Sequence, residues 1–202
     1  MDRKRREAAM QQSKVKKQVS IAMLASVGFV LMIFNFPIGF SSFLELDFGD
    51  VPAIIAAILY GPGAGIMVEA LKNVLHYIIM GNAAGVPVGQ LANFTAGVLY
   101  ILPASYLYRR MNSMKGLAIG LSAGTVLMAG AMSVLNYYLF IPAYTWFLNA
   151  PAMAAPELKA LIVSGILPFN LIKGIVMGFV FMAIFAKLKT WVHAQNDYKR
   201  AA

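Results

Sequence analysis

A lysine and an asparagine share one face of a strongly apolar segment near the carboxyl end of the chain. Asn170 and Lys173 lie within the run SGILPFNLIKGIVMGFVFMAIFA, which is long enough for a membrane-spanning helix. Residues three apart lie on the same side of a helix. A cation in a bilayer core costs at least about 2.5 kcal/mol on insertion scales, so Lys173 must face the protein interior or water. An ammonium and an amide on one face therefore predict a site for a polar ligand.

The composition identifies an integral membrane protein. The 202 residues are 60% hydrophobic and only 12% charged, and the mean hydropathy is +0.70. Such a chain consists mostly of spans and short loops, so we expect one membrane domain without a soluble catalytic module. There is no cysteine, which excludes thiol chemistry. With so few histidines, a transition-metal site is not expected.

The apolar runs predict an all-α membrane domain with six transmembrane helices. The expected spans are 19–36, 51–60, 66–80, 91–108, 116–141 and 161–186. The second run is too short to cross a hydrocarbon core of about 30 Å alone, so residues 51–80 form either two crossings or a re-entrant hairpin. Basic tails at 1–18 and 187–202 flank the membrane domain at 19–186.

Glycine, proline and acidic residues mark the predicted loops. Residues 37–50 form an acidic loop, and the sequence GPGAG at 61–65 breaks the helix between the second and third runs. We expect further loops at 81–90 and, because of its prolines, at 142–156.

The basic residues predict the orientation of the chain. Most of the 17 Lys and Arg residues lie in three groups, which precede the first span, separate the fourth from the fifth, and follow the last. With six crossings all three groups are cytoplasmic, as the positive-inside rule requires, whereas five crossings would place two groups outside. Both termini are therefore predicted to be cytoplasmic and the acidic loop to be outside. Because the basic groups border the spans, the net charge of +9 points to membrane lipids and not to nucleic acid.

Two glycine-rich motifs could suggest nucleotide binding or catalysis, but we favour neither interpretation. The sequence GPGAG at 61–65 lacks the Gly-Lys-Ser/Thr end of a phosphate-binding loop, so ATP-driven transport would need an ATPase on another subunit. The sequence GLSAG at 120–124 matches the nucleophile motif of hydrolases, but it lies in an apolar span. Small residues in a span allow close packing of helices, and we favour that interpretation.

A second charged cluster is predicted in the third run. Glu69, Lys72 and His76 follow one another at helical spacing and share one face. We favour an internally paired structural cluster, because pairing offsets part of the cost of burial. A ligand or proton-relay site is the alternative.

Asn136 is a third candidate for the predicted ligand site. It lies near the outer end of the fifth span, and Asn170 and Lys173 start just inside the outer end of the last span. All three could meet at similar depth. Amides offer both donors and acceptors whereas an ammonium only donates, so such a site suits a neutral, planar, hydrogen-bonding molecule.

Five motifs together resemble the substrate-binding (S) components of energy-coupling-factor (ECF) vitamin transporters, and within them the riboflavin-specific components. In chain order the motifs are FLELDFGDVPA at 43–53, YGPGAG at 60–65, EALKNVLHY at 69–77, GVPVG at 85–89 with Asn93, and PFNLIKG at 168–174. Each motif alone is weak, but their order and spacing cover essentially the whole membrane domain.

The resemblance implies a fold and a ligand site. It implies a six-helix bundle with the first loop as a gate over an outward-facing pocket. Riboflavin would be held by Leu44 and its neighbours in that loop and by Asn136, Asn170 and Lys173. We include two further residues of the resembling segments, Asp47 and Asn93, as ligand-binding candidates. Aromatic rings such as Tyr144 and Trp146 could shield the flavin or anchor the protein at the membrane interface.

The resemblance also implies partners. Such proteins bind the vitamin tightly but do not transport it alone, and they dock on one transmembrane coupling protein and two ATPase subunits. In the family, an Ala-x-x-x-Ala surface of the first helix meets the coupling protein. Here the positions are Ala22 and Ser26, whose small side chains also allow a close approach of helices.

The sequence therefore predicts the riboflavin-binding subunit of an ATP-driven importer in a prokaryotic cell membrane, with riboflavin as cargo and with no cofactor, metal or catalytic residue. Three alternatives stay open. The ligand could be flavin mononucleotide or another vitamin, although few cations lie outside the cytoplasmic groups to hold a phosphate. The chain could be a membrane enzyme that uses Glu69, Lys72 and His76 as acid–base residues. It could also be a stand-alone secondary transporter.

Overall fold

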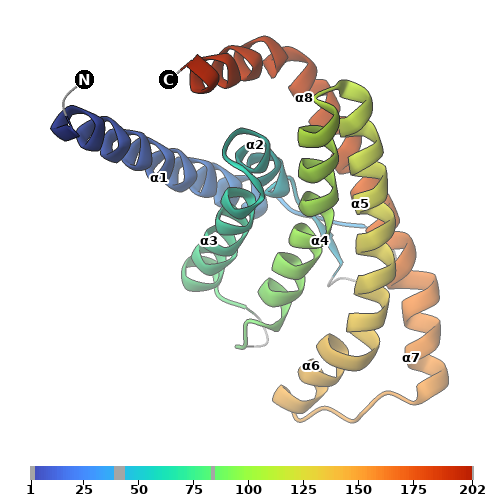
Figure 1. Cartoon of the computed structure of the whole chain (residues 1–202). Helices are drawn as coiled ribbons and strands as arrows, with labels where there is room; N and C mark the ends of the chain where they lie inside the picture. Colours follow the sequence, from blue (N-terminus) through green and yellow to red (C-terminus); the bar gives the residue numbers. More distant parts are fainter. Residues whose placement is uncertain (1–2, 39–43, 83–84, 202) are drawn as a thin grey trace.

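The computed structural model describes residues 3–38, 44–82 and 85–201, and side chains within 11–38, 44–82 and 85–187. It is a bundle of helices with one small two-stranded sheet (Figure 1). The main helices are α1 (Arg3–Ile33), α2 (Asp50–Tyr60), α3 (Pro62–Met80), α4 (Val88–Met111), α5 (Met114–Leu135) and α8 (Leu167–Ala201). The shorter elements are β1 (Phe36–Pro37), β2 (Glu45–Leu46), α6 (Ile141–Phe147), α7 (Ala155–Leu161) and the π-helical segments η1 (Asn136–Phe140) and η2 (Ile162–Ile166).

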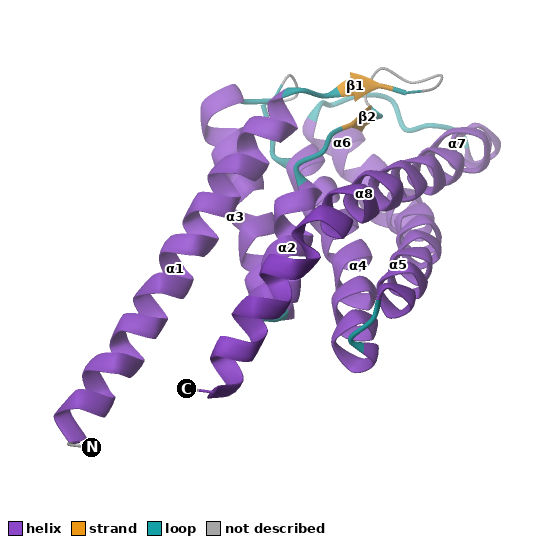
Figure 2. Ribbon diagram, turned by 90° about the horizontal axis from the view of Figure 1, so that it is seen from above, coloured by secondary structure: helices purple, strands orange, loops and turns teal. Residues whose placement is uncertain are grey.

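The all-α prediction is confirmed for this part of the chain. Figure 2 shows α2, α3 and α4 grouped within the bundle and the amino-terminal part of α1 projecting away from it. α1 begins at Arg3 and α8 continues to Ala201, so the described parts of the predicted basic tails are helical.

The second and third predicted runs form two helices that meet at a single glycine. Gly61 has a φ angle of 99°, which glycine adopts without the strain that a Cβ would cause, and α3 begins at the next residue, Pro62. The helix break is therefore narrower than the predicted 61–65. With 11 residues, α2 is about 16 Å long, roughly half of a hydrocarbon core.

The prediction of a proline-rich loop at 142–156 is wrong at both ends. The fifth helix continues through η1 into α6 and ends at Phe147, and the last helix starts at Ala155. Pro156 occupies the first turn of the last helix, where a missing N–H group is tolerated. Pro142 follows η1 at the start of α6, inside a continuous helical stretch. Both prolines, which the sequence pattern assigned to a loop, therefore lie in helical segments.

The acidic loop folds back on itself as a short hairpin. β1 pairs antiparallel with β2, with Phe36 opposite Leu46 and Pro37 opposite Glu45. Residues 39–43, including Phe43 of the first family motif, lie outside the described residues. After β2 the chain turns into the bundle, and Asp47 and Asp50 are buried there.

Close packing of α4, α5 and α8 forms the part of the core that supports the last helix. A Cβ on Gly124 would lie 2.4 Å from the carbonyl oxygen of Tyr100, and one on Gly120 would lie 2.7 Å from the Cα of Ala104. The Tyr100 hydroxyl donates to the carbonyl of Gly174 at 2.9 Å. The prediction that the GLSAG segment serves helix packing is therefore confirmed.

Only some of the helices look like membrane spans by length and composition. Within the described residues, three segments qualify, namely Gln11–Ile33, Met114–Phe147 and Ala155–Lys187. α3 and α4 do not qualify, although each is long, and several of their polar residues are buried, among them Lys72 and Gln90. Hydropathy alone therefore does not establish six crossings.

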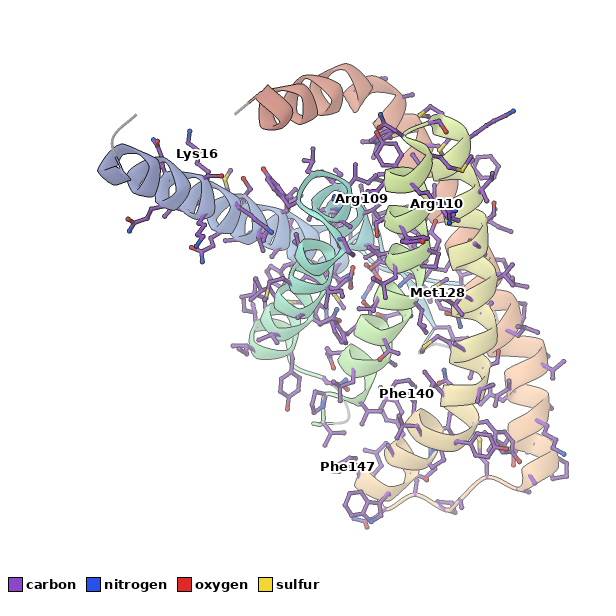
Figure 3. The ribbon with its side chains drawn as sticks, viewed as in Figure 1. Lys16, Arg109, Arg110, Met128, Phe140 and Phe147 are labelled. Atoms are coloured by element: carbon purple, nitrogen blue, oxygen red, sulfur yellow. The ribbon has the colours of Figure 1, made fainter. Side chains whose placement is uncertain are left out.

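The basic and aromatic ends of the bundle are separated in space. In Figure 3, Lys16, Arg109 and Arg110 lie toward one end, and Phe140 and Phe147 lie toward the other. The turn at Gly61 is at the basic end as well, because its Cβ position is 3.8 Å from the Arg109 guanidinium. α2 and α3 therefore form an antiparallel pair that reaches the basic end.

The glycine contacts yield a test of the packing. Gly124→Ala should lower the free energy of unfolding by about 1–3 kcal/mol, because its new methyl group overlaps backbone atoms of α4. Gly130→Ala, in the same helix, meets no atom within 4 Å and should leave stability unchanged or slightly higher. Thermal unfolding of both variants in one detergent, followed by circular dichroism, checks this. Equal losses in the two variants would contradict the close approach of α4 and α5.

Candidate functional site

Lys173 is buried in the bundle and faces two carboxylates, as its position in an apolar helix predicted. Its side chain is only 4% exposed. The ammonium nitrogen lies 3.2 Å from Oδ2 of Asp47 and 3.6 Å from Oδ2 of Asp50. Both partners come from the segment that enters the bundle after β2. Lys173 is therefore compensated inside the protein.

Asp47 has further partners that fix its position. Its Oδ1 accepts a hydrogen bond from the backbone N–H of Gly49 at 2.8 Å, which closes a local turn. Its Oδ2 also accepts from Nδ2 of Asn93 in α4 at 3.1 Å. The structure thus brings together three of the predicted site residues, Asp47, Asn93 and Lys173.

Asp50 connects this group to a second lysine. Lys72 of α3 donates a short hydrogen bond to Oδ1 of Asp50 and forms an ion pair with Oε2 of Glu69 at 3.0 Å. All three side chains are essentially inaccessible to solvent. We call Asp47, Asp50, Glu69, Lys72 and Lys173 the buried ion network.

The sequence reasoning missed Asp50 as a member of the site. It grouped Asp50 with the acidic loop, whereas the structure buries it as the first residue of α2. The predicted pairing of Glu69 with Lys72 is confirmed. His76 does not join the pair, because its ring lies beside Phe29, and its Nδ1 is 3.4 Å from Nε2 of Gln90. The available signal for Asp50 was its place in the FLELDFGDVPA motif.

Two of the three predicted asparagines, Asn136 and Asn170, occupy similar local settings. Asn136 donates to the carbonyl of Met132 and Asn170 to that of Ile166, each at 2.8 Å. Asn136 is the first residue of the π-helical segment η1, and Asn170 donates to Ile166, the last residue of the π-helical segment η2. Such segments occur frequently at functional sites. Sequence patterns did not reveal them.

Asn136 lies at a different level of the bundle from Asn170 and Lys173. Thr125 of α5 packs against Gly174 of the antiparallel α8, and Asn136 lies about 16 Å further along α5 than Thr125. Among the described residues, no hydrogen bond joins Asn136 to the buried ion network. The last helix starts at Ala155 and not at Leu161, so Asn170 and Lys173 also lie deeper than predicted.

The remaining predicted ligand residue, Leu44, lies near the π-helical segment of the last helix. Its Cδ1 is 4.0 Å from the Cβ position of Gly165. Asp47 reaches Lys173 and Asn93 further along the same segment. The stretch 44–50 therefore runs from η2 toward the buried ion network.

A separate surface hollow of about 420 Å³ lies beside η1 and η2. Its lining residues are Ser133, Val134, Tyr137, Tyr138, Lys159, Ile162 and Val163. It contains none of the predicted ligand residues and is lined mostly by apolar surface. The buried ion network is the stronger candidate site, because buried charges cost free energy and seldom persist in a span without a role.

The predicted docking residues lie on the outer face of α1. Ala22 and Ser26 are both exposed, and the Ser26 hydroxyl donates to the carbonyl of Ala22 at 3.0 Å. Large apolar side chains beside them are also exposed, including Met23 and Val27. This face of α1 is therefore apolar and includes two small side chains, those of Ala22 and Ser26.

Comparison with known proteins assigns the chain to a family. The ECF transporter, substrate-specific component family matches residues 16–185. The chain belongs to this family, and the resemblance predicted from the motifs is confirmed. Since the family is a component of transporters, the prediction of a transport protein and not an enzyme is also confirmed.

Individual relatives match over nearly their whole length. The chain is 59% identical to the riboflavin transporter FmnP of Bacillus subtilis (strain 168) over 185 residues, covering 91% of this chain and 97% of that protein. It is 42% identical to the riboflavin transporter RibU of Staphylococcus aureus (strain TCH60), covering 93% and 97%. A solved S component of a bacterial ECF transporter is 39% identical, with a TM-score of 0.75, and the match covers 89% of this chain and 98% of that one.

The pairing of Lys72 gives a prediction about stability. Lys72→Met should destabilise the fold by about 3–5 kcal/mol, because it leaves Glu69 buried without its cation and removes one of the two cations beside Asp50. The same substitution at the exposed Lys159 should change stability by no more than about 0.5 kcal/mol. Denaturant or thermal unfolding in detergent measures both. A Lys72→Met protein as stable as the Lys159→Met protein would contradict the network.

Proposed function

We propose that this protein is the riboflavin-binding membrane subunit of an ATP-driven ECF importer in a prokaryotic cell membrane. The observation that carries the proposal is the buried Lys173, held beside Asn93 and Asn170 on a scaffold whose relatives are named riboflavin transporters. Riboflavin is the transported ligand in this proposal and not a cofactor.

The polar groups suit an elongated neutral ligand. Lys173 supplies donors, and the amides of Asn93, Asn136 and Asn170 supply both donors and acceptors. Asn136 lies at a different level from Lys173, which matches a ligand with a ring system at one end and a polyol chain at the other. We propose that these four residues contact the ligand, that Leu44 covers it from the segment 44–50, and that Asp47 lies at the edge of the ligand site beside Lys173.

The balance of charge in the buried ion network favours a neutral ligand over a phosphate ester. Lys72 and Lys173 already face Asp47, Asp50 and Glu69, so a phosphate group would meet more carboxylates than cations. Free cations or a helix N-terminus usually hold a phosphate. Riboflavin is therefore preferred over flavin mononucleotide.

We further propose six crossings with both termini cytoplasmic. The support is that Lys16, Arg109 and Arg110 lie toward the same end of the bundle (Figure 3), as the positive-inside rule asks of cytoplasmic residues. In this topology α2 and α3 together cross and return, with residues 19–186 as the membrane domain between two basic tails.

We propose a transport cycle that membership of the family supports. The protein captures the ligand from outside, docks on a transmembrane coupling protein with two ATPase subunits, and releases the ligand inside at the expense of ATP. The docking surface in this proposal includes Ala22 and Ser26, which are exposed on α1 as a docking surface requires.

Ligand binding is tested directly on the purified protein. A preparation in mild detergent should be yellow or should quench the fluorescence of added riboflavin. Lys173→Ala should weaken binding at least about tenfold, because a hydrogen bond from a charged donor contributes roughly 1.5–3 kcal/mol. Lys187→Ala, an exposed position on the same helix, should bind normally. A colourless protein that does not quench riboflavin would refute the assignment of the ligand.

Substitutions that change the size of the side chain at position 26 test the proposed docking surface. Ser26→Leu should abolish uptake of riboflavin by cells that depend on this importer, because the larger side chain prevents close approach of a partner helix. Binding by the purified variant should be unchanged, since the Ser26 side chain is exposed and its hydroxyl donates to its own helix at Ala22. Ser26→Ala keeps a small side chain and should preserve uptake. Full uptake by Ser26→Leu would remove this face from the docking surface.

A further inference from the structure

The two carboxylates beside Lys173 are held in different ways. Asp47 belongs to the irregular segment between β2 and α2, and its partners besides Lys173 are the amide of Asn93 and the N–H of Gly49. Asp50 is the first residue of α2, and its Oδ1 is bound to Lys72. Asp47 is therefore attached to a connecting segment, whereas Asp50 is attached to a helix and to a second cation.

The carboxylate oxygen of Asp50 that faces Lys173 is not fully paired. Its Oδ2 is buried and lies 3.6 Å from the ammonium of Lys173, and it has no hydrogen bond among the residues that the structure describes. Asp47, by contrast, lies at hydrogen-bonding distance from the same ammonium. A small displacement of Lys173 toward Asp50 would give this buried oxygen a partner, which buried acceptors normally have.

A ligand that takes the Lys173 donor now directed at Asp47 must replace Asp47. The side chain of Lys173 is almost completely buried, and its resolved acidic partners are Asp47 and Asp50. If a ligand oxygen takes the place of Asp47, Lys173 keeps a counter-charge only through Asp50. Without it, the complex would hold an ammonium in a buried site with neutral acceptors alone, which is unfavourable.

We propose that Asp50 is a positioning residue, which retains and orients Lys173 in the ligand-bound state, and that Asp47 competes with the ligand for Lys173. This inference rests on the proposed function and adds opposite roles for two neighbouring carboxylates. Lys72 holds Asp50 in place through Oδ1, so that Oδ2 stays directed at Lys173.

The two roles predict opposite changes in riboflavin affinity. Asp50→Asn should weaken binding roughly tenfold or more, because the bound state loses the counter-charge of Lys173. Asp47→Asn should tighten binding by roughly tenfold, because the ligand no longer displaces a carboxylate. Fluorescence titration of the purified proteins with riboflavin measures both. Asn at position 47 keeps an oxygen that can accept from the N–H of Gly49.

Charge pairing indicates that both variants fold. In Asp50→Asn, Lys72 retains Glu69 and Lys173 retains Asp47, and in Asp47→Asn, Lys173 retains Asp50. Thermal unfolding should therefore stay cooperative in each. Asp47→Asn tests the proposal independently of Asp50, and a weaker affinity for this variant would overturn it.

A double-mutant cycle separates positioning from a general structural role. In a Lys173→Gln background the additional change Asp50→Asn should alter riboflavin affinity by less than about twofold, because the residue acts through Lys173. An undiminished effect in that background would overturn the inference. The wild-type titration separates the two proposals, since failure of the wild type to bind riboflavin contradicts the proposed function itself.

Discussion

The need to compensate two buried ammonium groups organises the centre of this protein. Lys72 and Lys173 lie on different helices, and neither has access to water. A cation in that environment is tolerated only with a carboxylate beside it. Asp50 lies between the two lysines and contacts both. The start of α2 is therefore fixed between α3 and α8, and the chain that precedes α2 must enter the bundle.

Several features of the fold follow from that requirement. Glu69 completes the charge balance of Lys72, and it lies so close to α4 that a Cβ on Gly97 would be 2.5 Å from its carboxylate. The aliphatic part of Lys72 lies next to α1, since a Cβ on Gly28 would be 3.6 Å from its Cβ and Cδ atoms. The buried ion network thus touches the helices that carry the proposed ligand residues and also the helix that carries the proposed docking surface. Contiguous contacts therefore lead from Lys173 through Asp50 and Lys72 to α1.

The site also shows how a binding protein can keep its charges satisfied without ligand. Asp47 gives Lys173 and Asn93 a partner within the chain. The amide nitrogens of Asn136 and Asn170 are likewise used by carbonyls of their own helices. A ligand that takes these donors exchanges with their internal partners, so the affinity it gains from each is the difference between the new hydrogen bond and the one it replaces.

The sequence by itself determined the helical membrane character, the interior direction of Lys173 and the family. Each depends on local composition, on the cost of a cation in lipid, or on motifs in a fixed order. The pairing of Glu69 with Lys72 was also predictable, because helical spacing sets it. Only the tertiary structure decided that Asp47 meets Lys173, across 126 positions of the chain, and that Asp50 joins the two lysines. It also decided that the helices continue through Pro142 and begin before Pro156. These features depend on how separate helices pack against one another, and local periodicity contains no information about that arrangement.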